Sequence, residues 1–102
     1  MAYCYNFPKI KAVSINDQAW KIVEEAHEVK VEAVYLYLAK EHGEPMDFKA
    51  LVVETLDSIQ SDETLLQFLV DEGFVTQGFI DNAKAEVIHK NRERGYYADG
   101  SD

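Results

Sequence analysis

The sequences EEAHE at residues 24–28 and ETLD at residues 54–57 place paired carboxylates inside two otherwise apolar segments. In each stretch two acidic residues stand three positions apart, and this spacing projects both from one face of an α-helix at adjacent turns. Apolar residues flank the acidic positions in both segments, so these charges border surfaces that would normally pack in a core. The pattern indicates an all-α protein organised around two acidic pairs.

Carboxylates beside apolar surface need protons, cationic side chains or a metal ion. The nearby cations are mainly Lys21 and Lys30. They are too few for the acidic residues of the two segments, which are Glu24, Glu25, Glu28, Glu32, Glu54 and Asp57. Carboxylate oxygens suit a hard divalent cation such as Mg²⁺, which keeps several waters and receives phosphate oxygens from a substrate. The competing interpretation is a solvated acidic stripe with ion pairs one turn apart, such as Lys21 with Glu25.

Length and charge narrow the function classes. The 102 residues predict one domain over 1–102, and a hydrophobic fraction of 47% excludes a disordered chain. The net charge of −9 argues against a nucleic-acid partner, because such binding needs Lys and Arg against the phosphates. An anionic nucleotide can still bind through a bridging metal ion.

Cysteine content and hydropathy predict a cytoplasmic protein. Cys4 is the only cysteine, so it has no internal disulfide partner, as is usual in a reducing cytosol. No apolar run approaches the roughly 20 residues of a membrane span, and residues 1–10 lack the apolar core of a signal peptide. We therefore expect no membrane partner.

Capping residues and glycines predict three helices. The first should run over residues 17–41, capped by Ser14, Asn16 or Asp17 and ended before Gly43. The second should begin at Asp47 and continue through residue 61 to residue 71, because its apolar positions keep a helical rhythm. A third should run from residue 76 or 77 to residue 94. Residues 1–13 should form an irregular arm, and residues 98–102 a frayed tail.

The first helix carries two apolar seams. One consists of Trp20, Val23, His27, Val31, Val34 and Leu38. The other consists of Ile22, Ala26, Val29, Ala33, Leu36 and Tyr37. Two seams imply two packing surfaces, so we expect a helical bundle completed by oligomerisation, as a homodimer or homotetramer.

The third helix ends in the one local concentration of positive charge, HKNRER at residues 89–94, followed by Gly95 and two tyrosines. One interpretation is compensation of the helix dipole by cations in the last turn. The other is a substrate-binding set in which Lys90, Asn91 and Arg94 contact phosphate oxygens and Tyr96 lies beside a base or sugar.

The ordered motifs EExxE, at residues 24–28, and ExxD, at residues 54–57, resemble those of the MazG-like branch of the all-α nucleoside triphosphate pyrophosphohydrolases. The 25 residues between Glu28 and Glu54 fit the spacing of that family. The ending KNRERGYY at residues 90–97 is similar to the tail of short, single-domain MazG-like proteins. The resemblance covers roughly residues 17–97.

The resemblance implies an Mg²⁺-dependent hydrolase, with Mn²⁺ as a possible substitute, that cleaves a nucleoside triphosphate into a monophosphate and pyrophosphate. It assigns Glu25, Glu28, Glu54 and Asp57 as metal ligands and Glu24 as a supporting or water-orienting residue. It also implies assembly from helical dimers. A role in house-cleaning or nucleotide-pool control would follow.

Two alternatives stay open. The phosphoribosyl-ATP pyrophosphohydrolases form a related all-α group of similar length, with a similar arrangement of acidic residues. An alternative from another class is a non-catalytic helical dimer, a binding or regulatory module that uses the acidic residues for a structural metal or for none.

Overall fold

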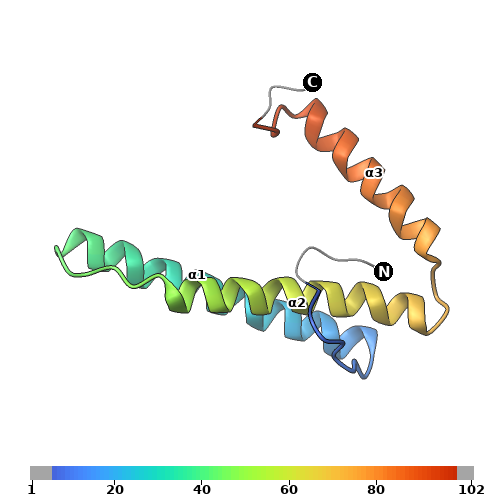
Figure 1. The fold of residues 1–102 in the computed structure, drawn as a ribbon, viewed down its shortest axis with the longest axis horizontal. Helices are drawn as coiled ribbons and strands as arrows, with labels where there is room; N and C mark the ends of the chain where they lie inside the picture. The colour runs from blue at the N-terminus through green and yellow to red at the C-terminus, as the bar shows by residue number, and fades with distance from the viewer. Residues whose placement is uncertain (1–5, 99–102) are drawn as a thin grey trace. The chain divides into compact units, whose positions relative to one another are not determined.

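A computed structural model describes residues 6–98, which form three α-helices and no strand (Figure 1). This confirms the all-α prediction. Contacts within the chain define two units that divide between Phe68 and Leu69. The first unit holds α1 and most of α2, and the second unit holds the end of α2 and α3. None of the helices in residues 6–98 combines the length and apolar character that a membrane span requires.

Helix α1 spans Ile15–Glu41. Ser14 is its N-cap, and the Ser14 hydroxyl oxygen accepts a hydrogen bond from the backbone N–H of Asp17 at 3.0 Å. Ser14, one of the three predicted caps, is therefore confirmed, and the helix begins two residues before the predicted residue 17. The helix ends as predicted, at His42, and Gly43 follows with a φ of +67°, which a residue without a Cβ adopts at little cost.

Helix α2 spans Lys49–Asp71 and is continuous through Ser61, as predicted. The Asp47 carboxylate accepts a hydrogen bond from the backbone N–H of Lys49 at 3.0 Å. Asp47 therefore satisfies a free donor at the start of the helix, although regular helix begins two residues later than predicted.

Helix α3 spans Gln77–Glu93 and is described here as part of the second unit. The hydroxyl oxygen of its N-cap, Thr76, accepts a hydrogen bond from the backbone N–H of Phe79 at 3.0 Å. Arg94 is the C-cap. Both predicted ends of the third helix are confirmed.

Helices α1 and α2 lie side by side (Figure 1). The side chain of Gln18 joins them. The Gln18 amide Nε2 donates a hydrogen bond to the backbone carbonyl of Ser61 at 2.9 Å. Gln18, Ser61 and Thr64 are the buried residues of the described chain, with exposed fractions of 8%, 6% and 7%. The two helices therefore meet most closely at small and polar side chains.

This contact fixes the antiparallel register of the two helices. Two helical turns take α1 from Gln18 to Glu25, and two turns in the opposite sense take α2 from Ser61 to Glu54. Because both steps return to the same face, Glu25 lies opposite Glu54. The acidic motifs are thus aligned by a hydrogen bond that lies outside both of them.

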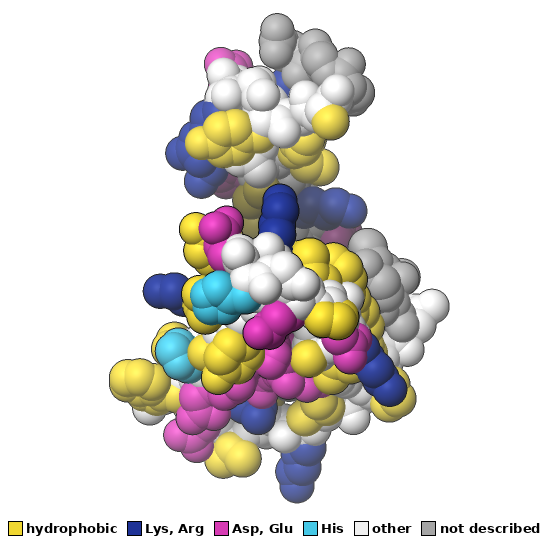
Figure 2. Space-filling view, turned by 90° about the vertical axis from the view of Figure 1, so that its left-hand side faces the viewer, with side chains coloured by type: hydrophobic (Ala, Val, Ile, Leu, Met, Phe, Trp, Pro, Cys, Tyr) yellow, Lys and Arg dark blue, Asp and Glu magenta, His cyan; other side chains and the backbone are white. Residues whose placement is uncertain are grey.

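Apolar side chains stay at the surface in both units. Among residues 6–98 no hydrophobic residue is buried, and Figure 2 shows hydrophobic side chains interspersed with acidic ones on the face in view. In the first seam Trp20 is 63% exposed and Val23 57% exposed, whereas Ile22, Val29 and Leu36 of the second seam are half-buried. One seam of α1 is therefore left largely uncovered within this chain.

Residues 6–13, the described part of the arm, have no regular secondary structure, and residues 6–10 lie against α2. The Gln60 amide Nε2 donates a hydrogen bond to the backbone carbonyl of Pro8 at 2.9 Å. The predictions made for Cys4 and for residues 99–102 fall outside the described residues.

Replacing Gln18 tests the contact between the helices. Gln18→Ala removes a buried hydrogen bond and leaves a void, so it should lower the free energy of unfolding by about 1–2 kcal/mol in urea titrations. Gln77→Ala is the matched control, because Gln77 makes an exposed side-chain hydrogen bond to Asp81. The control should change stability by less than about 0.5 kcal/mol. Equal losses in the two variants would show that the Gln18 contact does not hold the helices together.

Candidate metal centre

Three carboxylates from two helices converge on one point of the first unit. Glu25 projects from α1, and Glu54 and Asp57 project from α2. One carboxylate oxygen from each lies within 4.8 Å of the corresponding oxygen of the other two. We call these three residues the carboxylate cluster.

The spacing of two residues along α2 and one long-range contact place these groups. Glu54 and Asp57 are three residues apart in an unbroken helix, so they share a face at adjacent turns. Glu25 reaches them from the other helix because the Gln18–Ser61 hydrogen bond sets the register. The cluster therefore depends on the pairing of α1 with α2.

Within the cluster, the half-buried Glu54 has a clearly shifted pKa. Burial raises the pKa of Glu54 above its ordinary value, and the negative charges of Asp57, Glu28, Glu25 and Glu32 raise this pKa further. Each effect disfavours the charged carboxylate. The site therefore favours a proton or a cation at this position.

Lys21 supplies part of the compensating charge. Its ammonium nitrogen lies 3.0 Å from a carboxylate oxygen of Glu25, one turn along α1. The hydrogen bond to Glu25 and the charge of Glu25 raise the pKa of Lys21, and the charges of Glu24 and Asp57 act in the same direction. This is the ion pair that the stripe interpretation predicted, but the carboxylate of Glu54 makes no ion pair within residues 6–98.

The remaining acidic residues of the first motif lie outside the cluster. Glu28 is exposed and not among the converging oxygens, although its charge acts on Glu54. Glu24 is exposed and acts on Lys21. Of the four ligands that the family resemblance assigns, the structure thus brings three together and places Glu28 at the edge.

The donor set suits a hard divalent cation. Three carboxylates supply only oxygen ligands, which Mg²⁺ and Mn²⁺ prefer over softer donors. Two members of the cluster are half-buried and Asp57 is exposed, so one side stays open to water or to a phosphate oxygen. A cation here would also offset the repulsion that raises the pKa of Glu54.

The predicted substrate-binding residues belong to the second unit. Lys90 and Asn91 lie in the last turn of α3, and Arg94 caps it. The guanidinium carbon of Arg94 lies 5.9 Å from the centre of the Tyr96 ring, and Tyr96 is 69% exposed. Their contact with a substrate stays a prediction.

A second arginine joins this basic end, and the sequence interpretation left it out. The guanidinium carbon of Arg92 lies 5.6 Å from the centre of the Tyr97 ring. Two arginine–tyrosine pairs therefore follow one another at the end of α3, which supports stacking as well as dipole compensation. The alternation RERGYY was the signal for this pairing.

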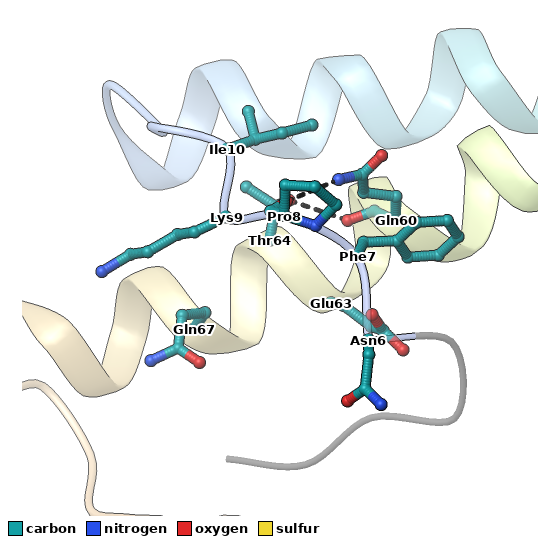
Figure 3. Close-up of a pocket in the computed structure, with 9 residues that line it drawn as sticks. All are labelled: Asn6, Phe7, Pro8, Lys9, Ile10, Gln60, Glu63, Thr64 and Gln67. Carbon is teal, nitrogen blue, oxygen red and sulfur yellow. Dashed lines mark hydrogen bonds between the residues drawn. The ribbon is translucent and has the colours of Figure 1, made fainter.

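The sequence interpretation also missed a pocket in the first unit. It lies between residues 6–10 of the arm and the α2 residues Gln60, Glu63, Thr64 and Gln67 (Figure 3). We call it the arm pocket. The signal was the recurrence of polar side chains at helical spacing after Asp57, on a helix whose other positions are mostly apolar.

Comparisons with known proteins return no match: no family model, no curated protein and no solved structure matches this chain.

The pKa of Glu54 predicts how stability depends on pH without divalent metal. The folded protein holds the Glu54 proton more tightly than the unfolded chain does, so the contribution of Glu54 to the free energy of unfolding is largest at low pH. That contribution falls as pH rises from below the ordinary value of 4.5 to above the raised pKa of the folded state. Glu54→Gln cannot ionise, so it should become progressively more stable relative to the wild type between about pH 4 and 7, measured by urea unfolding with a chelator.

The control for this experiment is Glu44→Gln, at an exposed position outside the cluster. Its stability relative to the wild type should stay constant over the same pH range. Adding Mg²⁺ near neutral pH should raise the melting temperature of the wild type and of Glu44→Gln but not of Glu54→Gln, with a larger rise for Mn²⁺. Parallel pH curves for Glu54→Gln and the wild type, together with no metal response, would favour the solvated stripe.

Proposed function

We propose that the protein is a Mg²⁺-dependent nucleoside triphosphate pyrophosphohydrolase, which cleaves (d)NTP to (d)NMP and pyrophosphate. The observation that carries the proposal is the convergence of Glu25, Glu54 and Asp57 from two helices. This convergence agrees with the order of the two acidic motifs in the MazG-like family. The negative charges that surround Glu54 support the proposal that this site binds a cation.

The residues divide into holding and positioning roles. Glu25, Glu54 and Asp57 would hold the ion, and Glu28 is near enough to influence Glu54 and to complete the set. A bound Mg²⁺ would offset charge on the phosphates and make a water molecule more nucleophilic. Glu24 would orient water from the exposed side of α1. Lys21 would hold the Glu25 carboxylate at the cluster through their ion pair.

The basic end of α3 would bind the anionic part of the substrate. Lys90 and Arg94 provide cationic donors in a chain of net charge −9, and Asn91 adds a polar group. The exposed Tyr96 ring, beside the Arg94 guanidinium, would lie beside the sugar.

Assembly belongs to the same proposal. The exposed first seam of α1, including Trp20 and Val23, supports a homodimer or homotetramer in which a second copy covers it. Sedimentation at micromolar concentration should give a species larger than a monomer, and Trp20→Glu should shift it toward the monomer. Asn16→Glu, which adds the same charge at an exposed position of the first turn, should not. A wild-type monomer would contradict this part of the proposal.

Activity is tested by the release of pyrophosphate from a panel of ribo- and deoxynucleoside triphosphates with Mg²⁺. The wild type should release pyrophosphate and not orthophosphate. Asp57→Ala and Glu28→Ala should each lower the rate by roughly 10²–10³-fold, because they remove charge stabilisation at the reacting phosphates. Arg94→Ala should chiefly raise KM, since it removes a phosphate contact.

The control is Glu44→Ala, which removes a carboxylate outside the cluster and should keep the wild-type rate. The panel also includes phosphoribosyl-ATP, so that the related enzyme class is tested with the same protein. Background release across the whole panel from folded, metal-loaded protein would instead favour the non-catalytic helical module.

A further inference from the structure

One hydrogen bond joins the two sides of the arm pocket, and a second one lies within its α2 side. Gln60 Nε2 donates to the carbonyl of Pro8 at 2.9 Å, which fixes the arm over α2 (Figure 3). Thr64 Oγ1 donates to the carbonyl of Gln60 at 2.8 Å, and Thr64 is only 7% exposed. The arm is thus tied to α2 at the pocket wall itself.

The size and lining of the pocket suit one small heterocycle. Its volume is about 240 Å³, below the roughly 300–1,000 Å³ of pockets that hold whole drug-sized ligands. Phe7 and Pro8 supply apolar surface on the arm side, while Gln60, Glu63 and Gln67 supply polar groups on the α2 side. Apolar walls with a few polar side chains are typical of ligand sites.

The pocket adjoins the α2 face that carries the carboxylate cluster at Gln60 and Thr64, whereas Glu63 lies about 120° further round the helix than Asp57. Gln60 is one turn after Asp57, and Thr64 is two turns after it. At 1.5 Å per residue, the α2 side of the pocket lies roughly 5–15 Å further along the helix axis than Asp57. A sugar separates the base of a nucleotide from its α-phosphate, so phosphates at the cluster would leave the base near this pocket.

Glu63 determines which hydrogen-bonding groups the pocket prefers. An ionised carboxylate only accepts hydrogen bonds, so it favours a ligand edge that presents N–H donors. Glu63 is half-buried, and burial, followed by the charge of Asp62, raises its pKa. The partial loss of water strengthens a hydrogen bond that a ligand donates to this group.

We propose that the arm pocket holds the base of the nucleotide substrate, and that Glu63 favours bases that present an N–H donor, such as the exocyclic amino group of adenine or cytosine, over analogues that lack it. This inference rests on the proposed function for the identity of the ligand as a nucleotide. It names a specificity-determining residue that lies outside both acidic motifs.

The test uses nucleosides, which carry no phosphate, on the full chain without divalent metal. Adenosine is compared with purine riboside, and cytidine with its analogue that lacks the 4-amino group, by NMR titration of the backbone and side-chain amides. The amino-bearing nucleosides should shift resonances of residues 6–10 and 60–67. They should bind roughly tenfold more tightly than their analogues, as one charge-assisted hydrogen bond predicts.

Two adjacent carboxylates give a matched pair of variants. Glu63→Ala should abolish the preference for the amino-bearing nucleoside, whereas Asp62→Ala should retain it, because the exposed Asp62 does not line the pocket. An intact preference in Glu63→Ala, or no shifts at residues 6–10 and 60–67 with millimolar nucleoside, would overturn the inference.

The outcomes separate this inference from the proposed function. Nucleoside binding at the pocket without pyrophosphate release would support the base site and contradict the hydrolase. Pyrophosphate release without nucleoside shifts at the pocket would support the hydrolase and overturn the base site.

Discussion

The hydrogen bond from Gln18 to the carbonyl of Ser61 sets the register on which the candidate site depends. Gln18 and Ser61 are buried in a chain whose described apolar residues all remain at least partly exposed. A directional bond between polar groups specifies one alignment of two helices more sharply than apolar contacts, which tolerate sliding. Two turns away from this bond, the same alignment brings Glu25 of α1 opposite Glu54 of α2.

Repulsion within the carboxylate cluster destabilises the pairing of α1 with α2 that brings its three members together. Bringing Glu25, Glu54 and Asp57 together raises the free energy of the folded chain, and Lys21 offsets only the part that falls on Glu25. The balance favours any species that supplies positive charge at this point. A divalent cation would therefore bind to a site that the fold has already assembled, and its binding would stabilise the pairing of the helices.

Local sequence patterns predicted the helices well, but they could not predict which residues make contacts between helices. Caps such as Ser14 and Thr76 bond to N–H groups three residues away, so the sequence alone can predict them. The predicted start of the first helix at Asp17 differs from the observed start by two residues. The spacing of Glu54 and Asp57 was equally local. Gln18 and Ser61 are 43 residues apart, and neither periodicity nor charge marks them as partners. Polar side chains at helical spacing mark the α2 side of the arm pocket, but its arm side could not be predicted, because Pro8 and Gln60 meet only in the folded chain.

The most direct measurement of the central claim is the paramagnetic broadening of amide resonances by substoichiometric Mn²⁺. A metal held by the carboxylate cluster should broaden the resonances of residues around Glu25, Glu54 and Asp57 first, and excess Mg²⁺ should reverse the effect. Acidic residues elsewhere, such as Glu44 and Glu72, should stay sharp at the same Mn²⁺ concentration. Broadening spread evenly over the exposed acidic residues of the chain would contradict a metal centre at this point.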